Sequence, residues 1–148
     1  MSRNTIGPNP ESAKQEDLAG RSHWTEVYER PADPFYRWEP KYYEERVLSS
    51  LLLQQARRIG AKSILEVGCG NSLFLPYLAR TANARVVAGL DYEPKGCELA
   101  KRRLEAAGVH GDVHCRDFFE VGPVDIGEYD LVYSLGVVEH FSDTVHVG

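Results

Sequence analysis

The sequence predicts an α/β fold built on a doubly wound, mainly parallel β-sheet. Short apolar runs that suit β-strands alternate with helical stretches along the chain, and this order is typical of parallel sheets. The first run, residues 64–67, leads into a glycine turn at Gly68 and Gly70, and a helical stretch follows it. A strand, a glycine turn and a helix N-terminus in succession form the nucleotide-site geometry of doubly wound sheets.

Length and composition indicate one globular domain. The chain has 148 residues, of which 43% are hydrophobic, and its formal net charge is −5. Such a charge gives no overall basic field, so nucleic acid is an unlikely partner class on this ground. No run of 18 apolar residues is present, so we expect no membrane span. Cys69, Cys97 and Cys115 form no metal-binding spacing, and without a signal-peptide core they predict reduced thiols in the cytoplasm.

Two helices are expected before the first strand. Residues 1–20 are polar and predict a flexible tail, so the folded domain is expected to span residues 21–148. Ser22 is expected to cap a short helix that Pro31 and Pro34 end. A longer helix is predicted over residues 40–59, and Gly60 stops it. One apolar stripe of this helix is expected to pack on the sheet: Tyr43, Val47, Leu48, Leu51, Leu52 and Ala56.

The glycine turn is the most informative part of the chain. Gly68 and Gly70 lack a Cβ, so the backbone can turn sharply there and approach a ligand closely. Ser72 or Asn71 can cap the following helix, predicted over residues 73–80. A nicotinamide or flavin site would have a third glycine where this chain has Leu73, which weakens that interpretation.

Two further strands end in acids. Residues 85–91 form a strand that ends at Asp91, 21 residues after Gly70, where a carboxylate can accept hydrogen bonds from ribose hydroxyls. A helix over residues 94–107 is closed by Gly108. The third strand, residues 112–116, is followed by Asp117 and Phe118, and an acid beside an aromatic ring suits an adenine.

Two motifs resemble those of a known family. The pattern Glu66-x-Gly68-x-Gly70 is similar to motif I of the class I S-adenosylmethionine-dependent methyltransferases. A fourth strand, residues 129–134, and the run over residues 135–141 resemble motif IV and the following helix of small-molecule methyltransferases. The resemblance implies a Rossmann-like fold with S-adenosyl-L-methionine as cofactor. It also implies methyl transfer to an O, N or C nucleophile of an acceptor substrate.

The resemblance also implies roles for single residues. Glu66 would orient the turn or meet the ammonium group of the cofactor through water, Asp91 would hold the ribose, and Asp117 with Phe118 would hold the adenine. Tyr92 would cover the adenine or remain an ordinary surface residue. The full set of expected cofactor-binding residues is Glu66, Gly68, Cys69, Gly70, Asn71, Asp91, Tyr92, Asp117, Phe118, Ser134 and Leu135.

No catalytic residue follows from the sequence with the same force. Glu139 and His140 stand where the acceptor site would begin, and they are the candidates. His140 is either a general base or a structural histidine. Methyl transfer often needs no base, because alignment of acceptor, methyl group and sulfur can supply several kcal/mol.

The acceptor signals point in two directions. The run over residues 135–140 is of the small-molecule type, which makes a small molecule the leading acceptor class. The aromatic segment from His23 to Trp38 resembles the opening of protein-lysine methyltransferases that modify elongation factors, so protein lysine comes second. Its rings, Trp24, Tyr28, Phe35, Tyr36 and Trp38, would cover the cofactor or simply pack on the sheet. A third alternative is a non-catalytic cofactor-binding module.

Only four strands are expected, whereas the family usually has seven. The four would pair in the order 3-2-1-4, with no residues for strands 5–7. The fourth strand would then be an open apolar edge, which favours aggregation. We therefore expect a chain truncated at its C-terminus, or a partner that completes the sheet.

Overall fold

A computed structural model describes residues 19–30, 38–137 and 140–141. Most of the expected flexible tail, residues 1–20, lies outside these ranges. The same holds for the two prolines expected to end the first helix, for Phe35 and Tyr36, and for the candidate Glu139.

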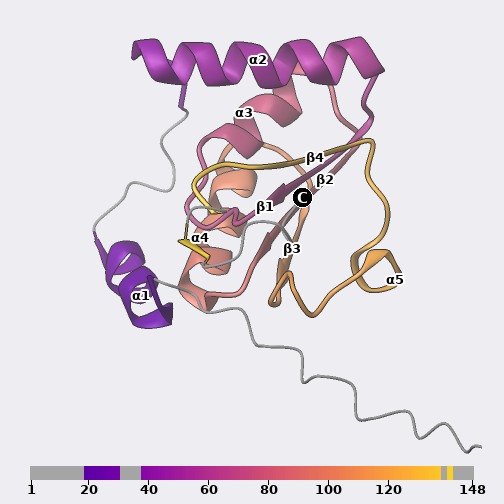
Figure 1. Cartoon of the computed structure of the whole chain (residues 1–148). Helices are drawn as coiled ribbons and strands as arrows, with labels where there is room; N and C mark the ends of the chain where they lie inside the picture. Colours follow the sequence, from indigo (N-terminus) through magenta and orange to yellow (C-terminus); the bar gives the residue numbers. More distant parts are fainter. Residues whose placement is uncertain (1–18, 31–37, 138–139, 142–148) are drawn as a thin grey trace, which may run out of the picture.

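The centre of the structure is a four-stranded parallel sheet (Figure 1). Its strands are β1 (Ser63–Val67), β2 (Val86–Asp91), β3 (Asp112–Cys115) and β4 (Leu131–Ser134). They pair in the order β3-β2-β1-β4, which confirms the predicted fold class and strand order. Because all four strands run in the same direction, their carboxyl ends meet at one edge of the sheet.

Five helices accompany the sheet in the described ranges: α1 (Arg21–Glu29), α2 (Tyr43–Ile59), α3 (Phe74–Thr81), α4 (Pro94–Ala106) and α5 (Pro123–Ile126). The first four lie within three residues of their predicted limits. The sequence analysis missed α5, because a single turn between Gly122 and Gly127 has no apolar periodicity to detect.

Helices α2, α3 and α4 cover one face of the sheet (Figure 1). Ile64 of β1 and Val87 of β2 point to this face and are fully buried against Leu75, Leu78 and Leu104 of the helices. The cluster of buried residues on the other face of the sheet is smaller. There Leu65, Ala88 and Leu90 pack against the segment between β3 and β4, which includes Ile126 of α5 and Tyr129.

One expectation about the leading helices is wrong, and a second holds only in part. Ser22 does not cap α1, because the helix already begins at Arg21 with Gly20 as its N-cap residue. Contact with α4 positions α1 instead, since the Thr25 hydroxyl donates a hydrogen bond to the Glu93 carboxylate at 3.2 Å.

The apolar stripe expected on α2 packs on the core only in part. Ala56 is buried in the cluster that contains Ile64 of β1, and Leu52 packs against this cluster. Tyr43 and Leu51 are 77% and 51% exposed, and Val47 and Leu48 are also exposed. The buried side of the helix is centred on Ser49 and Ala56, and it faces α3. The helix is therefore rotated relative to the expectation, because small side chains at the contact allow a close approach to α3.

Asp130 fixes the alignment of β4 with β1. Its Oδ2 atom accepts hydrogen bonds from the backbone N–H groups of Lys62 at 2.8 Å and Ser63 at 2.9 Å. The Ser63 hydroxyl in turn accepts one from the backbone N–H of Asp130 at 2.8 Å. These bonds lower the pKa of Asp130. The resulting register places Tyr133 of β4 opposite Glu66 of β1.

Gly89, in the middle of β2, allows the glycine turn to pack on the sheet. A Cβ at this position would lie 2.5 Å from the Sγ of Cys69, whose side chain is 1% exposed. We expect Gly89→Ala to lower the free energy of unfolding by about 1–3 kcal/mol through this overpacking. In a Cys69→Ala background the same change should cost less, and denaturant unfolding measures the difference.

Gly122→Ala is the control for this prediction, because a Cβ there would meet no atom within 4 Å. It should change stability by no more than about 0.5 kcal/mol. Equal losses for Gly89→Ala with and without the Cys69 thiol would show that this contact does not limit residue 89.

Candidate cofactor site

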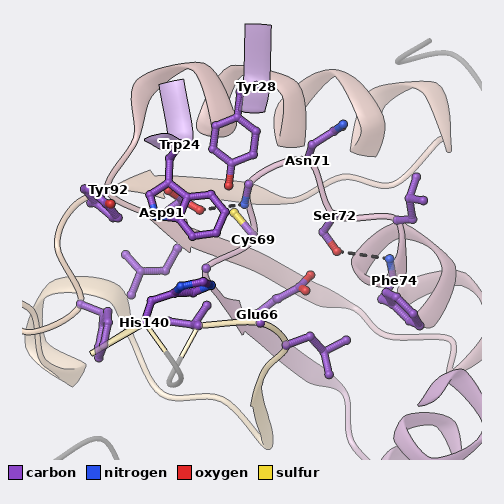
Figure 2. Close-up of a pocket in the computed structure, with 18 of the residues that line it drawn as sticks. Trp24, Tyr28, Glu66, Cys69, Asn71, Ser72, Phe74, Asp91, Tyr92 and His140 are labelled. Atoms are coloured by element: carbon purple, nitrogen blue, oxygen red, sulfur yellow. Dashed lines mark hydrogen bonds between the residues drawn. The ribbon is translucent and has the colours of Figure 1, made fainter. Parts of the chain in front are cut away.

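A cavity of about 350 Å³ opens at the carboxyl ends of the strands (Figure 2). Its walls come from the turn after β1, the ends of β2 and β3, the segment after β4, and α1. Cavities of this size accommodate cofactor-sized molecules. The place is the one where doubly wound sheets bind ligands.

The glycine turn forms the floor of the cavity. The backbone N–H groups of Gly68 and Cys69 donate hydrogen bonds to the carbonyl of Leu90, at 2.7 and 3.1 Å, and these bonds hold the turn against β2. Gly68 and Gly70 have φ angles of 72° and 31°. Residues with a Cβ rarely adopt such backbone φ angles, so both positions require glycine.

The turn leads directly into α3, as the sequence predicts. Ser72, one of the two expected caps, accepts hydrogen bonds from the backbone N–H groups of Phe74 and Leu75, each at 3.2 Å. The N-terminal end of α3, where helix N–H groups favour negative charge, therefore lies at the cavity wall with Leu73 and Phe74.

Asp91 lies at the end of β2 and lines the cavity, although it is only 6% exposed. One carboxylate oxygen accepts a hydrogen bond from the Gly70 N–H and the other from the Glu93 N–H, both at 2.9 Å. Burial raises the pKa of Asp91 above its usual value. Each oxygen retains acceptor capacity for a further donor.

Glu66 is the second buried acid of the cavity, with 2% of its surface exposed. The Tyr133 hydroxyl donates a hydrogen bond to its Oε2 atom at 3.1 Å, and Ser72 also bonds to its carboxyl group. Burial outweighs these hydrogen bonds and, with a smaller contribution from Asp91, raises the pKa of Glu66 to about 8. At neutral pH this side chain is therefore mainly protonated.

Two aromatic rings of α1 cover the turn. The rings of Trp24 and Tyr28 are stacked with centroids 6.2 Å apart, and both line the cavity. In Figure 2 the Tyr28 hydroxyl points toward the turn, and a Cβ on Gly70 would lie 2.0 Å from it. Burial and the neighbouring Asp91 raise the pKa of Tyr28. Trp38 instead is buried against Phe74 and Tyr77 of α3. That Trp24 and Tyr28 cover a cofactor stays a prediction.

Most of the predicted site residues come together in this cavity: Glu66, Gly68, Cys69, Gly70, Asn71, Asp91, Tyr92, Phe118, Leu135 and His140. Asp117 and Ser134 are not among the lining residues. Asp117 accepts a hydrogen bond from the Phe119 N–H at 3.0 Å and so shapes the turn that presents Phe118. Contacts of Asp117 with an adenine and of Ser134 with a methionyl group stay predictions.

Asn71 and Tyr92 lie at the margin of the site. The Asn71 side chain points away from Glu66 and accepts a hydrogen bond from the guanidinium of Arg103 on α4. The guanidinium of Arg21 lies 5.1 Å from the centroid of the Tyr92 ring. Both residues thus tie the turn and the β2 loop to neighbouring helices, and their contact with a cofactor is not tested.

Sequence reasoning missed several residues in and beside the cavity, and three of them shape it most clearly. Arg116 lines the cavity. It follows the last residue of β3, and a single basic residue at such a place forms no recognisable sequence motif. Val137 packs over Gly68, where a Cβ would lie 2.0 Å from its Cγ2 atom. Tyr133 could have been found from the strand order alone, since the pairing of β1 with β4 places it beside Glu66.

A family model of the methyltransferase domain matches residues 64–147. The chain belongs to the methyltransferase domain family. The matched residues begin at β1 and include the glycine turn, both buried acids and the whole described sheet after it. The strand order β3-β2-β1-β4 is that expected of its class I, Rossmann-like members.

Curated relatives of this methyltransferase domain have different substrates. This chain is 26% identical over 136 residues to the ubiquinone biosynthesis O-methyltransferase of Coxiella burnetii, and the match covers 92% of this chain and 55% of that protein. It is 29% identical over 129 residues to human EEF1A lysine methyltransferase 2, covering 78% and 54%. The chain thus spans about half the length of the curated relatives it matches.

Solved structures share the fold of this methyltransferase domain. The plantazolicin methyltransferase BpumL, solved with a monoazolic desmethylPZN analogue and SAH, gives a TM-score of 0.58 at 16% identity, covering 85% of this chain and 45% of that one. Magnesium protoporphyrin IX methyltransferase of Synechocystis PCC 6803, solved with SAH, gives 0.52 at 17% identity, covering 82% and 55%. Separately, none of the helices in the described ranges is long and apolar enough to cross a bilayer.

The raised pKa of Glu66 predicts a specific pH dependence of stability. Between about pH 4.5 and pH 8 the folded state holds a proton on Glu66 that the unfolded state has released. The free energy of unfolding should therefore fall as pH rises through this window, by at most about 1.4 kcal/mol per pH unit. Glu66→Gln, which resembles the protonated form, should remove this contribution.

Denaturant unfolding at pH 5.5, 7 and 8.5 measures this effect. The difference in stability between Glu66→Gln and the original chain should shift in favour of the variant as pH rises. Asp112→Asn, an exposed acid at the start of β3, is the control and should leave the pH profile unchanged. Parallel profiles for Glu66→Gln and the original chain would show that Glu66 is ionised in the folded state at neutral pH.

Proposed function

We propose that this domain binds S-adenosyl-L-methionine and transfers its methyl group to an acceptor, most favourably a small molecule. The observation that carries the proposal is the convergence of Glu66, the glycine turn and Asp91 on one cavity at the carboxyl ends of β1 and β2. Membership of the methyltransferase domain family supports it, as do the relatives and solved structures named above.

The residues of the cavity fit the parts of this cofactor. The two oxygens of Asp91 can accept hydrogen bonds from the ribose hydroxyls, because the Gly70 and Glu93 N–H groups hold the carboxylate in place. Phe118 and Tyr92 offer aromatic faces for the adenine at the same end. The N-terminal end of α3 favours the methionyl carboxylate.

The remaining groups of the site suit the positive charges of the cofactor. Glu66, protonated in the free domain, can release its proton and compensate the cationic methionyl end. The rings of Trp24 and Tyr28 offer electron-rich faces to a sulfonium. Such faces attract a cation although the rings themselves carry no net charge. The apolar walls restrict water around the reacting groups.

The cofactor supplies an electrophilic methyl group on a positively charged sulfur. The chain's task is then to align the acceptor with that group and to exclude water. His140 lines the cavity, and its ring lies edge-on to Trp24 with centroids 4.9 Å apart. This contact supports the structural role for His140 over that of a general base, because the ring is already engaged by packing.

A protein-lysine acceptor is the second candidate. Two observations favour it: the 29% identity to human EEF1A lysine methyltransferase 2, and the placement of Trp24 and Tyr28 at the cavity. A non-catalytic cofactor-binding module, completed by further strands along β4, is the third. A cytoplasmic location agrees with all three, since the cysteines at positions 69, 97 and 115 are free thiols.

Asp91→Ala tests the ribose contact. Loss of hydrogen bonds to a charged group costs about 1.5–3 kcal/mol, so the Kd for S-adenosylmethionine in calorimetry should rise about 10- to 150-fold. Asp112→Ala removes an acid at the opposite end of the sheet and should bind as the original chain does. Because Asp91 also supports the turn, circular dichroism should verify that the variant is folded. An unchanged Kd in a folded variant would contradict the assignment.

A methyl-transfer assay tests the reaction itself. The domain is incubated with radiolabelled S-adenosylmethionine and a cell extract, which is then separated into protein, RNA and small molecules. We expect label on a methylated product in the small-molecule fraction, and much less of it with the Asp91→Ala variant. Label on protein would instead support the lysine acceptor. Tight cofactor binding without transfer to any fraction would support the non-catalytic module.

A further inference from the structure

Two cysteine side chains meet beside the backbone of Asp91, at the carboxyl end of β2. The Cys97 thiol, on α4, donates a hydrogen bond to the backbone carbonyl of Asp91 at 3.4 Å. Cys115, the last residue of β3, is the register partner of Asp91 in the β2–β3 pair. The two thiols interact with each other through their side chains.

The two thiols differ in their access to solvent. Cys97 is 3% exposed, whereas Cys115 is exposed. Burial and then the neighbouring Cys115 raise the pKa of Cys97, so Cys115 is the thiol that reacts first with a reagent from solution. An accessible thiol next to a second, resolving cysteine is a common arrangement among cysteines that form reversible disulfides.

We propose that Cys97 and Cys115 form a redox-controlled disulfide that weakens cofactor binding when an oxidant such as hydrogen peroxide is present. Disulfide formation is independent of the proposed function, and only its effect on affinity rests on that function. Cys69, in the glycine turn, takes no part, because its thiol is buried against Gly89.

The chemistry balances with one equivalent of peroxide. The deprotonated Cys115 sulfur attacks one peroxide oxygen, the O–O bond breaks, and the departing hydroxide takes up a proton to give water. The Cys97 sulfur then attacks the resulting sulfenic acid, so that an S–S bond forms and the S–O bond breaks. The second hydroxide takes the Cys97 proton as water. Two thiols are oxidised, one peroxide is reduced to two waters, and a dithiol reductant reverses the change.

The disulfide would move the β3 end rather than α4. A sulfur–sulfur bond of about 2.05 Å is much shorter than a contact between thiols. The first turn of α4 is held in place, because Glu93 caps it by accepting a hydrogen bond from the Gly96 N–H at 2.8 Å, and Tyr28 packs on Gly96. β3 is a four-residue edge strand and yields more easily.

Movement of the β3 end reaches the cavity directly. Arg116 and Phe118 follow Cys115 by one and three residues, and both line the cavity. Oxidation also removes the hydrogen bond from Cys97 to the Asp91 carbonyl, whose carboxylate lines the same cavity. The disulfide therefore changes both sides of the expected adenosine site.

Peptide mapping tests the disulfide. The chain is treated with hydrogen peroxide, alkylated and cut with trypsin, which releases Cys97 in residues 96–101 and Cys115 in residues 104–116. We expect these two peptides joined, with a mass two hydrogens below their sum. Cys69, in residues 63–80, should remain alkylated. Failure to find the joined peptide, with Cys115 oxidised to a sulfinic acid instead, would overturn the proposal.

Calorimetry with S-adenosylmethionine tests the effect on binding. The oxidised chain should bind about fivefold more weakly or worse, and dithiothreitol should restore the original Kd. Cys115→Ser should bind as the reduced chain does and should not respond to peroxide. A disulfide that leaves the Kd unchanged would refute the switch. No binding by the reduced chain would contradict the proposed function, while the peptide map would still decide whether the disulfide forms.

Discussion

Asp91 joins three parts of the chain that lie far apart in the sequence. Its carboxylate holds the Gly70 N–H of the turn after β1 and the Glu93 N–H at the start of α4. Its carbonyl accepts the Arg116 N–H at 2.8 Å and the Cys97 thiol. Asp91 thus supports the glycine turn, the start of α4 and the end of β3. A ligand that bonds to Asp91 would therefore be coupled to the positions of all three segments. The glycine turn is held both by the bond from the Gly70 N–H to Asp91 and by the Leu90 carbonyl, which accepts the Gly68 and Cys69 N–H groups.

Two buried acids in one cavity are costly to ionise. Burial raises the pKa of both Glu66 and Asp91. Asp91 in turn raises the pKa of Glu66 and of Tyr28. Burial of these groups adds little to stability, because within the described residues Glu66 bonds to hydroxyl groups and to no cation. Acids that are perturbed in this way are typical of functional sites. The proposed cofactor, with its positive charges, would compensate them.

The sequence could predict the sheet and most of the site because both depend on strand ends. Apolar runs followed by glycine or acid define where each parallel strand stops, and Glu66 and Asp91 meet as expected. Helix orientation could not be predicted in this way. Leu51 and most of the expected α2 stripe are exposed, because the helix packs through the small residues Ser49 and Ala56. Tyr133 depends on strand pairing, which no local pattern contains.

The two segments that give conflicting signals about the acceptor are in contact. Trp24 belongs to the aromatic segment that resembles protein-lysine methyltransferases, whereas His140 belongs to the run of the small-molecule type. Their rings meet edge to face, with centroids 4.9 Å apart, and both line the cavity. Neither sequence segment therefore shapes this wall of the cavity alone. If the domain transfers a methyl group as we propose, the two rings together would limit which nucleophiles can approach past them.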